Sequence, residues 1–184
     1  MVAIAATPRS RPHRIFSPGL LDNLWRTTSV PLLIVNPHHA TRNGTPPHPP
    51  KTVIVPCPLN TADSALPFAS AIAGASRSTV VVLTKSAASV ELEDELKNKF
   101  TNDDVRIEIQ HASGNIVQQV LGLQSENNGS WIVSNSRMRS VLGSFADSIA
   151  RNALGPVVVV PDAKVMRQRE RDAHELTRNI PSSL

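Results

Sequence analysis

Short apolar runs alternate with helical patterns between residues 52 and 161. The apolar runs that predict strands lie at 53–55, 79–83, 105–109, 131–133 and 157–160. The segments with helical spacing lie between them, at 61–75, 89–100, 115–124 and 144–153. The run TVVVL at 79–83 predicts a buried strand, whereas VRIEI at 105–109 alternates and predicts a half-buried or edge strand. Strands that alternate with helices predict an α/β fold, an open, mostly parallel five-stranded sheet with helices on both faces.

The residues on either side of this segment have a different character. Residues 38–51 include Asn43-Gly44 and four prolines, and so many turn-forming residues predict a linker. Residues 162–184 are rich in charge and predict a helical tail. The predicted organisation is therefore an N-terminal unit over 1–37, a Pro-rich linker over 38–51, a complete domain over 52–161 and a charged tail over 162–184.

The N-terminal unit repeats part of the domain. Residues 18–37 align without a gap on residues 143–162, so that Asp22 falls on Asp147, Arg26 on Arg151 and Pro31 on Pro156. Upstream, the apolar residues 2–5 match residues 131–134. Each copy then consists of a strand, a basic loop, a helix, a proline and a strand. Two ordinary α/β units with a shared pattern are the alternative explanation.

Composition excludes several classes of protein. The chain of 184 residues is long enough to bury a core without disulfides or metals. Aromatic residues make up 3% with no tyrosine, which disfavours a protein that stacks nucleic-acid bases on aromatic rings. The single cysteine, Cys57, excludes an intrachain disulfide and a cysteine-rich metal site. No apolar run approaches the roughly 20 residues that cross a membrane.

The positive charge is concentrated in the N-terminal part. Residues 1–51 carry six basic residues and one acidic residue, whereas residues 52–161 carry eight basic and ten acidic residues. Because the predicted domain is slightly acidic, the basic character of the chain does not predict a nucleic-acid partner. An Arg-rich, acid-free N-terminus is also a feature of transit peptides, and this alternative stays open beside the repeat.

The order of these segments resembles the universal stress protein family. KTVIVPCPLNTADSALPFASAIA resembles its first strand and helix, SGNIVQQVL its third strand-to-helix turn, and WIVSNSRMRS followed by GSFADSIARNALGPVVVV its last strand, loop, helix and strand. This resemblance spans residues 51–161. Residues 2–35 resemble the last third of a second copy, so the chain resembles a tandem protein without the first two-thirds of its first domain. Whether the chain is a fragment stays open.

The resemblance implies a site for ATP, which many members of the family bind. It implies a loop G-x2-G-x9-G-[ST] between the fourth strand and the last helix. Here Asn135 and Met138 stand at the first two glycine positions, and only four residues separate Met138 from Gly143-Ser144. The position of the family's nucleotide-contacting aspartate is Pro58. The candidate residues of a degenerate nucleotide loop are Asn135, Arg137, Arg139, Gly143 and Ser144, and no metal site or catalytic residue is predicted.

Three functions follow from the resemblance. The first is a cytoplasmic stress-response or regulatory protein that acts by binding and dimerisation and not by turnover. The second is an ATP-binding stress protein with weak or no hydrolysis. The third is an interaction module that has lost its nucleotide site. In the family the last strand often pairs with its equivalent in a second domain or subunit, so we expect residues 31–35 to pair with residues 156–160, in a homodimer or within the chain as a tandem pseudo-dimer.

Overall fold

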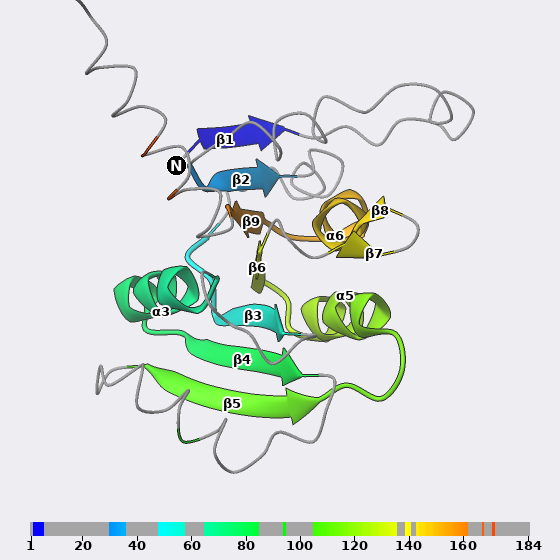
Figure 1. The fold of residues 1–184 in the computed structure, drawn as a ribbon. Helices are drawn as coiled ribbons and strands as arrows, with labels where there is room; N and C mark the ends of the chain where they lie inside the picture. Colours follow the sequence, from blue (N-terminus) through cyan, green and yellow to red (C-terminus); the bar gives the residue numbers. More distant parts are fainter. Residues whose placement is uncertain are drawn as a thin grey trace, which may run out of the picture.

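In the computed structural model, a single sheet of seven strands organises the chain (Figure 1). The structure describes residues 2–5, 30–35, 48–57, 65–84, 94, 105–135, 139–140, 143–161, 167 and 171. The strands of the sheet are β1 (Val2–Ala5), β2 (Leu32–Val35), β3 (Thr52–Cys57), β4 (Thr79–Thr84), β5 (Arg106–His111), β6 (Trp131–Asn135) and β9 (Val157–Val160). Their order across the sheet is β1-β2-β9-β6-β3-β4-β5.

The five strands from β9 to β5 confirm the predicted α/β fold. Adjacent strands within this group are all parallel, as expected for strands joined by helical crossovers. The edge position of β5 agrees with its alternating sequence, since its residues are exposed or half-buried. The sheet is larger than the five strands expected, because β1 and β2 extend it beyond β9.

Three helices of the domain are described, and they cover both faces of the sheet. They are α3 (Ala65–Ser76), α5 (Ile116–Glu126) and α6 (Phe145–Asn152). The predicted beginning of the first helix, residues 61–64, lies outside the described residues. The predicted helix at 89–100 also lies outside them, except for Asp94, which is helical. The helix predicted from residue 144 begins one residue later, because Ser144 belongs to a short strand.

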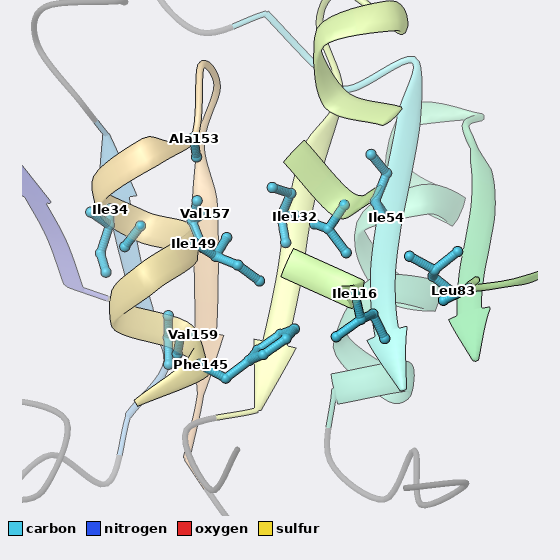
Figure 2. Packing of buried hydrophobic residues seen from close by; sticks show 14 residues of the cluster. Ile34, Ile54, Leu83, Ile116, Ile132, Phe145, Ile149, Ala153, Val157 and Val159 are labelled. Carbon is cyan, nitrogen blue, oxygen red and sulfur yellow. The ribbon is translucent and has the colours of Figure 1, made fainter. Parts of the chain in front are cut away.

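Alternate residues of the central strands contribute to two separate cores. On one face, Ile54 and Ile132 pack with α5 and α6, which contribute Val120 and Ile149 among others (Figure 2). On the opposite face, buried residues of the same strands pack against α3; they are Val53, Val55 and Val133. This arrangement explains the continuous apolar runs of the sequence, because a strand covered on both faces has no solvent-facing side.

The N-terminal strand β2 pairs with β9 in antiparallel orientation. This pairing confirms the expected contact between residues 31–35 and 156–160 within the chain. Leu33 lies opposite Val158, and the repeat alignment makes these two residues equivalent. Like any two directly opposed residues of an antiparallel pair, they have a local twofold axis between them, perpendicular to the sheet, which we call the pseudo-twofold axis.

Strand pairing places the upstream segments in a register one residue away from the repeat alignment. Val2 pairs with Leu32, and Ile132 pairs with Val157, which is the equivalent of Leu32. Val2 therefore corresponds to Ile132 and not to Trp131. The sequence comparison missed this because a run of small apolar residues matches almost as well in either register, whereas backbone pairing distinguishes the two.

The linker and the tail lie mostly outside the described residues. The described end of the linker, His48–Pro50, has no regular secondary structure, in agreement with its composition. In the tail, Arg167 and Arg171 are helical and exposed. Among the helices that the structure describes, none is long and apolar enough to span a lipid bilayer.

Candidate functional site

The strand order reverses between β3 and β6, and we call the place outside the carboxyl ends of these two strands, where such a reversal predicts a crevice, the crevice. From β3 the chain continues to β4 and β5 on one side, whereas β6 and β9 lie on the other side. In open α/β sheets, ligands bind outside the carboxyl ends of the strands at the point where the order reverses. Here those ends are Cys57 on β3 and Asn135 on β6. The predicted loop thus begins at the place where topology alone predicts a ligand.

Four of the five predicted site residues lie at this crevice or in the hairpin that follows it. Asn135 ends β6 and is half-buried. The chain then forms a small antiparallel hairpin of β7 (Arg139–Ser140) and β8 (Gly143–Ser144), in which Arg139 is the Cα partner of Ser144. The fifth predicted residue, Arg137, lies outside the described residues.

Two short strands lie within the predicted nucleotide loop. Residues 139 and 140 pair with residues 144 and 143, so the backbone of these four residues takes part in strand pairing. Ser144 is followed directly by α6, whose first two residues, Phe145 and Ala146, are buried in the core. The first turn of α6 is therefore fixed in position. Its N-terminus carries the positive end of the helix dipole, which favours an anionic group.

A second group of residues at the carboxyl edge was missed by the sequence analysis. Cys57, Thr84 and His111 end β3, β4 and β5 and lie in one register row across the sheet. Thr84 is fully buried, and its Oγ1 lies 3.1 Å from Nδ1 of the exposed His111. The residues are 27 positions apart in each case, so no local motif joins them; their common position at the ends of predicted strands was the available signal.

The turn before α5 lies at the same edge of the sheet, because it follows β5. Asn115 caps the helix: its side-chain oxygen accepts from the backbone N–H of Val117 at 3.0 Å and of Gln118 at 3.4 Å. Gly114 precedes it with φ of +101°, a conformation that glycine adopts without strain. The motif SGN therefore forms a rigid turn beside the crevice, as its sequence predicts for a helix start.

A cavity of about 230 Å³ lies elsewhere, between the sheet and the end of α5. Thr52, Thr79, Glu108 and Asn127 contribute to its wall. Thr52 and Thr79 begin their strands, so this cavity is at the amino half of the sheet, away from the crevice. Topology and the residues present favour the crevice as the functional site.

The described residues offer no evident metal centre. Among them, no group of three or more His, Cys, Asp or Glu side chains is arranged to hold a metal ion. Cys57 is 1% exposed and packs in the core beside α3. Burial of this kind makes a thiol part of the packing and limits its access to reagents.

These features define an open, doubly wound α/β protein whose strand order reverses between β3 and β6. The sequence matches no protein-family model and no curated protein. Its structure, however, is similar to a universal stress protein from Archaeoglobus fulgidus DSM 4304, with a TM-score of 0.57 and 21% identity over 73% of this chain and 50% of that one. The fold of this chain is the universal stress protein fold.

Two further structures from Pseudomonas aeruginosa align over more of the chain. A putative universal stress protein from strain UCBPP-PA14 has a TM-score of 0.58, and a functionally unknown protein from strain PAO1 has a TM-score of 0.57. Each is 14% identical over 94% of this chain and 67% of its own. The chain thus spans about half of the Archaeoglobus protein and two thirds of the Pseudomonas proteins, and at these identities the likeness concerns the fold.

Proposed function

We propose that this protein is a universal-stress-type regulatory protein of the cytoplasm that acts by binding and by a pseudo-dimeric association within its own chain. The observation that carries the proposal is the isologous pairing of β2 with β9 in a chain with the universal stress protein fold. The chain has a single cysteine and therefore no intrachain disulfide, which is compatible with a reducing compartment.

In this proposal, residues 1–37 are the C-terminal part of a first stress domain and residues 52–161 are a complete second one. The antiparallel pairing of Leu32–Ile34 with Val157–Val159 then stands for the contact between two domains. Leu32 and Ile34 are 2% and 1% exposed, so this contact belongs to the core of the molecule. Because β2 occupies the outer edge of β9, that edge is closed to a second copy of the chain.

Light scattering after gel filtration tests this part of the proposal. We expect a monomeric mass at micromolar concentration. Leu33 belongs to the buried cluster on the α3 side of the sheet, so the variant Leu33→Asp places a charge in this core and should detach β2 from β9. The exposed edge of β9 could then pair with a second copy, which would raise the measured mass. The matched control is Val30→Asp, at a position 40% exposed just before β2. A wild-type dimer whose mass is unchanged by Leu33→Asp would contradict the proposal.

The second candidate function is binding of an anionic nucleotide such as ATP, with weak or no hydrolysis. Support comes from the position of Asn135 at the switch point and of Arg139, Gly143 and Ser144 in the hairpin before α6. Backbone N–H groups at a helix N-terminus and an arginine are the groups that bind phosphate in proteins. Arg137 is proposed as a further contact.

Thermal unfolding with and without Mg-ATP tests the second candidate. Ligand at 100 times its Kd stabilises a protein by about 2.7 kcal/mol, a shift that is easily measured. The double variant Arg139→Ala/Ser144→Ala should abolish the shift. Arg106→Ala, which removes an exposed arginine from the far edge strand β5, should retain it. No shift for the wild type at millimolar Mg-ATP would leave the interaction module as the function.

A further inference from the structure

Among the strands that the structure describes, β1 lies at one edge of the sheet, and its outer side resembles an interior position. The two edge strands of the seven-stranded sheet are β1 and β5, and no other described strand pairs with the outer side of β1. Figure 1 shows the two at opposite ends of the sheet. An edge of this kind presents unpaired N–H and C=O groups that can pair with another polypeptide.

The backbone hydrogen-bond pattern identifies the residues of β1 whose N–H and C=O groups point to the outer edge of the sheet. The N–H of Ile132 donates to the carbonyl of Pro156, so the backbone groups of Ile132 point to β9. Because the backbone groups of successive residues point to opposite sides of a strand, those of Val157 and Val159 point away from β6 and toward β2. Leu32 and Ile34 lie opposite these two valines, so their backbone groups bond with β9. The backbone groups of Leu33, which lies between them, therefore point to β1.

In the parallel pair of β1 and β2, the residue Leu33 then bonds with the two residues that flank its Cα partner, namely Val2 and Ile4. The backbone groups of Ala3 and Ala5 consequently point to the outer edge. This orientation matches β6, where Val133 and Asn135, the equivalents of Ala3 and Ala5, face β3.

The outer edges of β1 and β5, the two edge strands among those described, differ in their protection against pairing with another strand. On β5, Arg106, Glu108 and His111 place charged or titratable groups along the strand, and Nε of Arg106 forms an ion pair of 3.1 Å with Glu108. Natural sheets use such charges to prevent association at their edges. The sequence of β1, Val-Ala-Ile-Ala, contains no charge and no proline.

The pseudo-twofold axis indicates what pairs with β1. It relates β2 to β9 and β1 to β6, and β6 has β9 on one side and β3 on the other. The position beyond β1 therefore corresponds to that of β3, a parallel strand with the uncharged, β-branched core Val53-Ile54-Val55.

We infer that the outer edge of β1 is a docking site for an extended segment of another polypeptide, uncharged and β-branched, which adds to the sheet parallel to β1 as β3 does to β6. The site rests on the pseudo-twofold axis and on backbone pairing. It is independent of nucleotide binding at the crevice, so either proposal can fail alone.

The probe is a synthetic peptide with the sequence of residues 51–57, in which Cys57 is replaced by serine and two lysines and a fluorophore are added at the N-terminus. We expect a saturable rise in fluorescence anisotropy on titration with the full chain. The variant Ala3→Pro/Ala5→Pro removes two N–H donors from the outer edge but keeps the bonds between β1 and β2, and should weaken binding by about tenfold or more.

The matched control is Ile109→Pro, which removes an outward N–H from the other edge strand. The N–H of Ala112 donates to the carbonyl of Thr84. The backbone groups of the even-numbered residues of β5 therefore point to β4, and those of Ile109 point to the outer edge. Circular dichroism checks that each variant is folded, and binding by this control should be unchanged.

Amide exchange of the wild type provides a readout that needs no variant. Without peptide, the amides of Ala3 and Ala5 should exchange faster than that of Ile4, and peptide should protect both. A spin label at the N-terminus of the peptide should broaden Val2 more than Ala5, as parallel docking requires. The inference is overturned if the peptide does not bind, if binding survives the double proline variant, or if Ala3 and Ala5 become protected with protein concentration alone, which would indicate a second copy at this edge.

Discussion

The buried side chain of Gln124 joins two turns at the amino end of the sheet. It is 3% exposed, and its amide nitrogen donates to the carbonyl of Ser130 at 3.1 Å while its oxygen accepts from the N–H of Leu154 at 2.9 Å. Ser130 leads into β6 and Leu154 leads into β9, so one amide fixes the starts of two neighbouring strands. We predict that Gln124→Ala is among the more destabilising single substitutions in the domain.

The magnitude follows from the partners that the substitution leaves behind. The carbonyl of Ser130 lies in a residue 1% exposed, and loss of its donor costs about 1–3 kcal/mol. The N–H of Leu154 is only part-buried and adds about 1 kcal/mol. The expected total is therefore about 2–4 kcal/mol, a large share of the roughly 5–15 kcal/mol by which a domain is stable. Gln124→Leu should lose nearly as much, because it restores volume but not the hydrogen bonds.

Urea denaturation followed by circular dichroism measures this loss as a fall in the transition midpoint with an unchanged slope. The matched control is Gln118→Ala on the exposed side of the same helix, which should change stability by less than about 0.5 kcal/mol. A loss below about 1 kcal/mol for Gln124→Ala, or full recovery in Gln124→Leu, would refute the reasoning, because the hydrogen bonds would then contribute little.

Three further predictions use the same denaturation assay. Gly155→Ala should cost about 1–3 kcal/mol, because its Cβ would lie 2.8 Å from the carbonyl oxygen of Ser130 and 3.0 Å from Nε2 of Gln124; the loss should be smaller in a Gln124→Ala background, and equal losses in both backgrounds would exclude the contact. Asn115→Ala should cost about 1 kcal/mol by removing the cap of α5, whereas Asn115→Ser should restore most of it; equal losses would argue against capping. Ile34→Ala should cost about 2–5 kcal/mol, since Ile34 is 1% exposed in the core of the α5 and α6 face, and Val30→Ala at an exposed position should be nearly neutral; a neutral Ile34→Ala would mean that β2 is not part of the core.

Much of the fold followed from local patterns. The run TVVVL became β4 within one residue, and the alternating VRIEI became the edge strand β5. Asn115 was predicted to begin a helix and caps α5. These successes share a cause, because burial on one face or two sets the apolar period of a strand, and this period can be counted along the chain.

The candidate site followed less completely. The segment from Asn135 to Ser144 was identified by its resemblance to a nucleotide loop, yet residues 139–144 contain a hairpin. Thr84 and His111 went unnoticed, because they are polar residues in unremarkable sequence that come together only through strand register. A site at the end of a parallel sheet is assembled from strands far apart in sequence, and no local signal carries that information.

The chain's own residue pattern thus specifies most of the strands and helices that the structure describes. The order of the strands, the one-residue correction to the repeat and the meeting of Leu33 with Val158 depend on pairing between distant segments. Local preferences act over a few residues, whereas strand pairing selects among registers and neighbours that are almost equal in local terms. Strand β2 is an example: its apolar residues predict that it is buried, but only the tertiary structure shows that it pairs with β9.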